Sequence, residues 1–103
     1  MIEMIVAGPV VQWPSEDHPA WDIACMRGAP VHATIDGHLE TGWSGRMGNT
    51  VTITGDKGRA YYAHLRDTIE PRVVAAGEVI GTCGNTGSWS SGPHVHYEFN
   101  RPR

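Results

Sequence analysis

The feature that most constrains the fold of this chain is an alternation of polar and apolar residues from His94 to Phe99, near the C-terminus. Successive side chains of an extended strand point to opposite faces, so this alternation predicts a β-strand with one polar and one apolar face. The polar face would carry His94, His96 and Glu98, while the apolar face would pack in the core. The Cα atoms of the two histidines would lie about 6 to 7 Å apart. Both imidazoles would then reach a common centre, which indicates either a metal site or a catalytic pair.

The rest of the chain also favours β-structure. Its thirteen glycines and seven prolines among 103 residues indicate many turns rather than long helices. Short runs rich in β-branched residues are separated by turn signals roughly every eight to twelve residues. We therefore predict an all-β fold, a single compact domain of about seven short strands in mostly antiparallel sheets, such as a β-sandwich, with almost no helix. A chain of this length is expected to form one domain, over residues 1–103.

Local signals predict where the chain turns. The pair Asp36–Gly37 predicts a hairpin turn, and Gly55–Gly58 predicts another. Residues 42–49 are typical of a long glycine-rich loop. In the strand that follows the second turn, regular alternation would place Tyr62 and His64 on the same face.

A second informative stretch runs from residue 18 to residue 24. The spacing between His18 and Asp22 would suit one face of a helix, but the intervening proline and the β-rich surroundings favour an extended segment. In that segment the histidine and the aspartate share a face, and Trp21 and Ile23 point into the core.

Four of the six histidines are predicted at strand positions beside turns, and Asp22 joins them. These histidines are His18, His64, His94 and His96. A catalytic zinc ion typically takes three protein ligands from histidine and carboxylate and leaves a fourth position to water. The spacing does not decide which three of the five would bind. His32 and His38 are most simply surface residues of a hairpin, and no role is assigned to them.

Cys25 and Cys83 are the only cysteines. Each lies in a predicted strand region, where a small buried thiol is common, so free thiols are expected. A disulfide is the alternative if the two strands lie side by side.

Charge excludes some partners. The formal net charge is −3 and the basic residues are scattered, so no footprint for nucleic acid is expected. The apolar run at Met4–Ala7 is too short for a signal peptide or a membrane span. We therefore expect no signal peptide and no membrane span in this chain.

Four motifs in this order resemble the lysostaphin-type (LytM-like) zinc endopeptidases of peptidoglycan. They are His-x-x-x-Asp from His18, Tyr-Ala-His-Leu from Tyr62, Gly-x-Thr-Gly from Gly84, and Gly-Pro-His-x-His-x-Glu from Gly92. The resemblance covers residues 9–99, which we take as the core of the predicted peptidase domain. It implies the lysostaphin-like fold, also called the duplicated hybrid motif.

The resemblance also implies a division of roles. His18, Asp22 and His96 would bind one zinc ion, and His64 and His94 would form the catalytic pair. The implied reaction is hydrolysis of peptide bonds in peptidoglycan cross-links or stems, with an imidazole passing a proton to the leaving amine. The residues alone do not distinguish the role of His94 from that of His96.

Several neighbours are candidates for contacts with substrate. Tyr62 would donate a hydrogen bond from the face of His64, the alternative being a sheet tyrosine that only packs. Trp43 and Trp89 lie in loops rich in glycine and serine, where exposed aromatics often contact ligands, so they are candidate groove walls. Glu98 would either orient a histidine or simply be solvated.

Two alternatives to an active endopeptidase stay open at this point. One is a family member that has lost hydrolysis and binds the wall or regulates a partner. The other is a zinc-dependent hydrolase or binding protein on an unrelated β-scaffold. The expected partners are peptidoglycan peptides, and the expected oligomeric state is a monomer. The chain would act on the cell wall, outside the cell or in the periplasm, as a fragment of a longer protein, a phage-type lysin or a virion-associated enzyme.

Overall fold

The computed structural model describes residues 5–16 and 20–101, which form nine β-strands and no helix. The predicted all-β class is confirmed. In this described part of the chain, no helix is long and apolar enough to cross a membrane.

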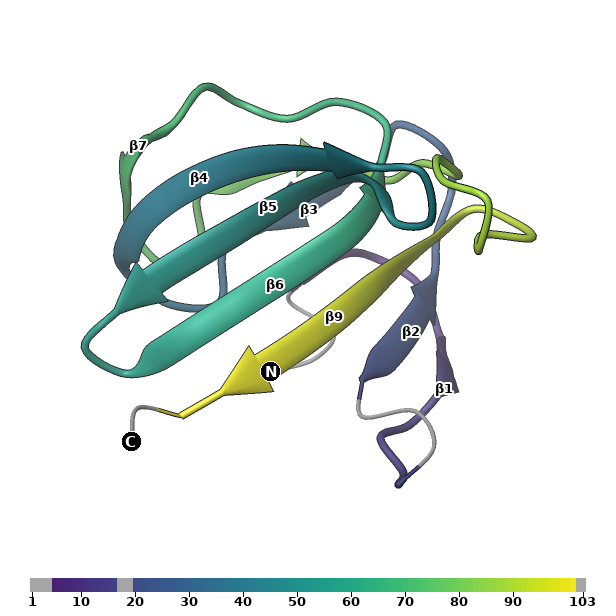
Figure 1. Cartoon of the computed structure of the whole chain (residues 1–103), viewed down its shortest axis with the longest axis horizontal. Helices are drawn as coiled ribbons and strands as arrows, with labels where there is room; N and C mark the ends of the chain where they lie inside the picture. The colour runs from purple at the N-terminus through teal and green to yellow at the C-terminus, as the bar shows by residue number, and fades with distance from the viewer. Residues whose placement is uncertain (1–4, 17–19, 102–103) are drawn as a thin grey trace.

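Seven of the strands form one antiparallel sheet in the order β1-β2-β9-β6-β5-β4-β7 (Figure 1). Their bounds are Val10–Gln12 (β1), Trp21–Ala24 (β2), Gly37–Ser44 (β4), Gly48–Gly55 (β5), Gly58–Leu65 (β6), Arg72–Val74 (β7) and His94–Asn100 (β9). The other two strands, β3 (Pro30–His32) and β8 (Val79–Thr82), pair as a second, smaller antiparallel sheet. Figure 1 shows β3 behind β5 and β6, so the two sheets form layers.

The core lies between these layers. Ile23, Ile53 and Val95 of the large sheet and Val31 and Ile80 of the small sheet are fully buried in one cluster. Burying each such aliphatic side chain contributes roughly 1.5 to 3 kcal/mol before the entropic cost of ordering it. Because one face of the large sheet packs in this core, its opposite face is left for the groove described below.

The C-terminal strand follows its predicted pattern. β9 spans His94–Asn100, and both Val95 and Tyr97 are buried. His94 and His96 lie on the opposite face and line the groove. The predicted alternation is therefore confirmed in this strand.

The predicted hairpin at Gly55–Gly58 is confirmed, since β5 and β6 pair directly across it. The hairpin predicted at Asp36–Gly37 is wrong, because β3 pairs with β8 and not with β4. The chain passes here from the small sheet to the large one, and Asp36 Oδ1 instead accepts a hydrogen bond of 2.8 Å from the Ala76 backbone N–H. A Cβ at Gly37 would collide with the Thr54 carbonyl, so this glycine permits close packing and not a hairpin turn.

The long loop predicted over residues 42–49 is also shorter than expected. β4 continues to Ser44 and β5 begins at Gly48, leaving only residues 45–47 as a turn. Glycine-rich segments can remain extended when a neighbouring strand supplies the hydrogen bonds, and here the two strands pair along their full length.

Cys25 and Cys83 form a disulfide, which corrects the expectation of free thiols. The backbone brings them together because the Gly28 N–H donates to the Cys83 carbonyl and the Cys83 N–H donates to the Ala29 carbonyl, each at 2.8 Å. The Cα atoms lie 6.3 Å apart, within the range that a disulfide requires. The bond ties the end of β2 to the segment that leaves β8.

Candidate active site

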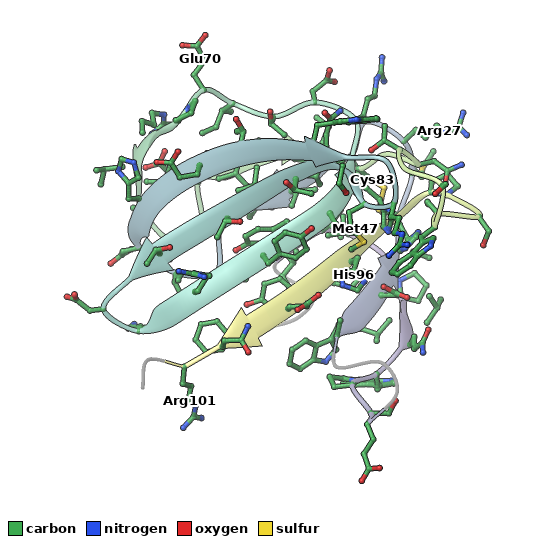
Figure 2. The ribbon with its side chains drawn as sticks, in the orientation of Figure 1. Arg27, Met47, Glu70, Cys83, His96 and Arg101 are labelled. Carbon is green, nitrogen blue, oxygen red and sulfur yellow. A yellow bond between two sulfur atoms is a disulfide. The ribbon has the colours of Figure 1, made fainter. Side chains whose placement is uncertain are left out.

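The face of the large sheet that does not pack in the core carries a groove of about 870 Å³. Met47 and His96, both labelled in Figure 2, line it from the β4–β5 turn and from β9. Asp22, His64 and His94 line it as well, so the groove gathers four of the five residues predicted for the site. The fifth, His18, lies outside the described residues.

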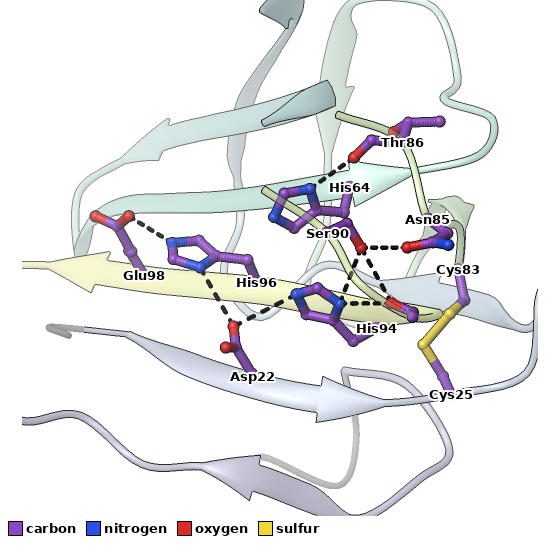
Figure 3. Close-up of polar contacts among 11 residues, drawn as sticks. Asp22, Cys25, His64, Cys83, Asn85, Thr86, Ser90, His94, His96 and Glu98 are labelled. Carbon is purple, nitrogen blue, oxygen red and sulfur yellow. Dashed lines mark hydrogen bonds and ion pairs between the residues drawn. A yellow bond between two sulfur atoms is a disulfide. The ribbon is translucent and has the colours of Figure 1, made fainter. Parts of the chain in front are cut away.

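Strand register brings Asp22 beside the histidines of β9. β2 pairs with β9 so that Asp22 lies opposite His96. Asp22 Oδ1 is 3.3 Å from His96 Nδ1 and 3.8 Å from His94 Nε2 (Figure 3). One carboxylate oxygen is therefore close to both imidazoles.

The orientation of His96 is set by Glu98. The Glu98 Oε2 atom lies 2.8 Å from His96 Nε2. Because a carboxylate accepts, Nε2 of the neutral ring carries the proton and Nδ1 keeps its lone pair. The Nδ1 lone pair and the Asp22 carboxylate oxygen, two electron-pair donors, then face each other at 3.3 Å.

These two electron-pair donors, His96 Nδ1 and Asp22 Oδ1, could bind a cation between them. Imidazole nitrogen and carboxylate oxygen are ligands that zinc accepts, and a carboxylate on the far nitrogen of a ligating histidine is the usual way to fix its tautomer. Within residues 5–16 and 20–101, no group of three histidine, cysteine, aspartate or glutamate side chains is placed to hold a metal ion. The described part thus holds two of the three ligands that the resemblance implies.

His64 reaches the groove through a β-bulge. Val51 of β5 pairs with Tyr62 and Asn49 pairs with Leu65, so β6 has one more residue than β5 between these pairs. His64 has a φ of 63°, and no other described non-glycine residue has a positive φ. A bulge of this kind re-aims a side chain, and strained backbone of this type is often found at functional sites.

Contacts from two loops hold the bulged residue. The His64 backbone N–H donates to the Met47 carbonyl at 2.8 Å, and His64 Nδ1 lies 2.7 Å from the Thr86 carbonyl oxygen. Since a carbonyl only accepts, Nδ1 carries the proton and Nε2 is the basic atom. Burial lowers the pKa of His64, with the Thr86 carbonyl partly opposing this, so the neutral ring is favoured.

His94 is oriented in the same way. Its Nδ1 lies 2.8 Å from the Gly92 carbonyl oxygen and 3.2 Å from the Ser90 hydroxyl oxygen, whose own proton is donated to Asn85 Oδ1. Nε2 of His94 is therefore also the basic atom. The rings of His64 and His94 have centroids 4.7 Å apart, and Nε2 of His94 lies 3.8 Å from Asp22 Oδ1.

The predicted substrate contact by Tyr62 is not supported, because this side chain lies in the core with 0% exposure. Its hydroxyl accepts from the Thr34 backbone N–H at 2.9 Å and bonds the Thr34 hydroxyl at 2.8 Å. Burial raises the pKa of Tyr62 to about 12. The cause of the error is the bulge, which breaks the alternation between Tyr62 and His64.

Tyr61 takes the position that Tyr62 was expected to occupy. It lines the groove, and its ring centroid lies 6.3 Å from that of His96. Burial, and then the charge of Glu98, raises the pKa of Tyr61. No sequence signal marks the bulge, and the cross-strand pairing of Tyr61 with Glu98 is visible only in the structure.

Of the two tryptophans predicted as groove walls, only Trp89 lines the groove. Trp89 is largely exposed and lines the groove, with the Arg46 guanidinium 4.9 Å above its ring. Trp43 is equally exposed but is not among the lining residues. It lies four positions beyond the buried Leu39 on the same strand, so it projects toward the core side of the sheet, past the end of the core.

The two loops beside the site are packed closely together. The Ser88 N–H donates to the Gly45 carbonyl at 2.8 Å, and the Trp89 N–H donates to the Arg46 carbonyl at 3.1 Å. Gly87 has a φ of 89°, and a Cβ there would collide with the backbone of residues 46–48. This glycine therefore allows the close approach that positions the Thr86 carbonyl.

Comparison with known proteins identifies the family. The sequence profile of "Peptidase family M23" matches residues 16–103. The DD-carboxypeptidase/endopeptidase Mpg of Neisseria meningitidis serogroup B is 43% identical over 84 residues, which are 79% of this chain and 19% of that protein. An uncharacterized metalloprotease of Haemophilus influenzae is 36% identical over 88 residues, covering 81% of this chain and 18% of that protein. The chain thus spans about a fifth of the length of these curated relatives.

Solved structures of peptidases share the fold of this chain. The catalytic domain of the antimicrobial peptidase lysostaphin from Staphylococcus simulans superposes with a TM-score of 0.73 at 30% identity, covering 93% of this chain and 78% of that one. The architecture predicted from the resemblance is therefore confirmed. The chain belongs to peptidase family M23 and has the lysostaphin-like fold of these peptidases.

Proposed function

We propose that this chain is a zinc-dependent endopeptidase that hydrolyses peptide bonds in the cross-links or stems of bacterial peptidoglycan. Membership of an M23 peptidase family supports hydrolysis of peptide bonds. The Neisseria relative named as a carboxypeptidase and endopeptidase, together with lysostaphin, supports a cell-wall peptide as the substrate. The observation that carries the proposal is the pair of histidines, His64 and His94, whose ring centroids lie 4.7 Å apart in the groove that Asp22 also lines.

Asp22 and His96 would hold the zinc ion, with His18 as the third ligand. Zinc bound there would lower the pKa of water and polarise the scissile carbonyl. Glu98 would keep the Nδ1 lone pair of His96 directed at the metal, because it holds the proton on Nε2.

His64 and His94 would move the protons. Each has Nδ1 committed to a backbone carbonyl, so each can accept or release a proton only at Nε2. One such nitrogen can take the proton of the attacking water, and the leaving amine nitrogen receives a proton as the peptide bond breaks. The lowered pKa of His64 favours the neutral form that this step requires.

Mass spectrometry of peptidoglycan fragments tests the proposal. Purified fragments are incubated with the zinc-loaded protein, with and without a zinc chelator, and new amino termini are sought. We expect new termini that disappear with chelator and that a His94→Ala protein does not produce. If folded, zinc-loaded protein releases none from several wall chemistries, the proposal is wrong.

That negative result would favour a family member that binds the wall or regulates a partner without hydrolysis. The described site residues do not point that way, since Asp22, His64, His94 and His96 all line one groove. We propose further that the domain acts as a monomer on the cell wall, outside the cell or in the periplasm.

A further inference from the structure

The groove continues along the sheet beyond the histidines and carries a single lysine or arginine, Arg59, among its described lining residues. Arg59 belongs to β6 and lies opposite Asn100 of β9, which also lines the groove. Figure 1 shows β6 and β9 running side by side over their length, so this pair lies at the end of the groove away from the loop that precedes β9.

Cross-strand register divides the floor of the groove into three rows. His96 stands in the first row, opposite Ala63. Tyr61 and Glu98 form the second row, and Arg59 and Asn100 form the third. Successive rows on one face of an antiparallel sheet are two residues apart, so the third row lies roughly 13 to 14 Å from the first.

Within residues 5–16 and 20–101, no carboxylate forms an ion pair with Arg59. The nearest acid along the groove floor, Glu98 of the second row, is already bonded to His96 at 2.8 Å. Arg59 is exposed, so a ligand would meet its guanidinium without displacing a protein partner. The planar fork of its donors matches a carboxylate, and the Asn100 amide can add a further donor.

We infer that Arg59 binds a free carboxylate of the substrate peptide. This inference rests on the proposed function and adds a specificity site to it. An extended peptide advances about 3.3 to 3.6 Å per residue, so the bound carboxylate belongs to a residue about four positions from the scissile bond. Glu98 in the middle row repels a carboxylate placed two positions away, which makes the preference positional.

The test uses the stem peptide of peptidoglycan, synthesised with all carboxylates free or with one at a time converted to a carboxamide. Binding of each fluorescently labelled peptide to zinc-loaded His94→Ala protein is measured by anisotropy, with and without Arg59→Gln. We expect one carboxamide to bind about tenfold more weakly than the free acid, and Arg59→Gln to reduce that ratio to about one. Lys57→Gln removes a positive charge from the β5–β6 turn, outside the groove lining, and should retain the tenfold ratio.

Equal affinities across the set, a ratio that survives Arg59→Gln, or no binding of any peptide would each overturn the inference. Hydrolysis of the same peptides by the unsubstituted zinc-loaded protein is scored separately. Hydrolysis without a carboxylate preference contradicts only the Arg59 site. A preference in binding without hydrolysis of any peptide or wall fragment contradicts the proposed function and leaves the Arg59 site standing.

Discussion

The two neighbouring strands β9 and β6 bring histidines to the same groove in different ways. In β9 the alternation is regular, and His96 is oriented by Glu98, two residues further along the same strand. In β6 a bulge breaks the alternation, and His64 is held by carbonyls of two loops, at Met47 and Thr86. The orientation of His96 therefore depends on its own strand, whereas that of His64 depends on loop packing.

This difference predicts how substitutions will act. Changes on β9 should alter metal binding or proton transfer directly. Changes far from β6 in sequence should alter the position of His64 while leaving His96 in place.

The largest expected effect comes from separating the two histidines of β9. His96→Ala should empty the zinc site, whereas His94→Ala should keep zinc and lower turnover by about 10²- to 10⁴-fold. Zinc content of purified protein by elemental analysis and peptide hydrolysis measure the two outcomes. If both variants lose zinc alike, the division of roles on β9 is wrong.

The second prediction tests the loop-held half. Gly87→Ala should displace the Thr86 carbonyl, because the added methyl collides with the backbone of residues 46–48 and the φ of 89° is unfavourable for alanine. A displacement of about 1 Å costs roughly 100-fold in turnover, and zinc content should not change. Crystallography of the variant would show the movement.

Gly45→Ala is the matched control, since a Cβ there has open space around it. It should leave turnover within about twofold, as surface changes usually do. Equal losses in both variants would mean that His64 does not depend on this loop contact.

The same contrast explains what sequence reasoning could predict. The strand from His94, the hairpin at Gly55–Gly58 and the core position of Ile23 all follow from local periodicity and turn chemistry, and the structure confirms them. The H-x-H spacing on a regular strand likewise indicates a shared centre for the two histidines, independently of any family resemblance.

Local patterns could not show features that depend on partners far along the chain. The bulge before Leu65 exists because loop carbonyls capture His64, so Tyr62 was predicted on the wrong face. The disulfide and the pairing of β3 with β8 depend on segments that are more than forty residues apart. Asp36–Gly37 carries a hairpin signal, but the pairing available to β3 elsewhere determines the path of the chain.

A third prediction sharpens the comparison on β9. Glu98→Gln keeps the shape of the side chain but removes the carboxylate that bonds His96 Nε2. Loss of such a partner typically weakens metal affinity by about 10- to 100-fold. Zinc affinity is measured by competition with a chromophoric chelator.

The chain supplies its own control, because Glu40 bonds His38 at 2.6 Å with the same two-residue spacing on β4. That pair is exposed and outside the groove lining, so Glu40→Gln should leave zinc affinity unchanged. An affinity that drops equally in both variants would reflect a general effect of lost charge.

The smallest expected effect separates two adjacent tyrosines of β6 that the regular alternation of the strand places on opposite faces. Tyr62→Phe removes a buried hydroxyl bonded to Thr34 and should lower the free energy of unfolding by about 1 to 2 kcal/mol. Tyr61→Phe removes a hydroxyl that faces the groove and should change that free energy by less than about 0.5 kcal/mol. Urea denaturation of the two variants measures both. The Thr34 backbone N–H still donates to Tyr62 in a Thr34→Val background, so part of the loss in Tyr62→Phe should persist there. A loss of undiminished size in that background would show that the Thr34 hydroxyl, which also bonds Tyr97, contributes nothing to it.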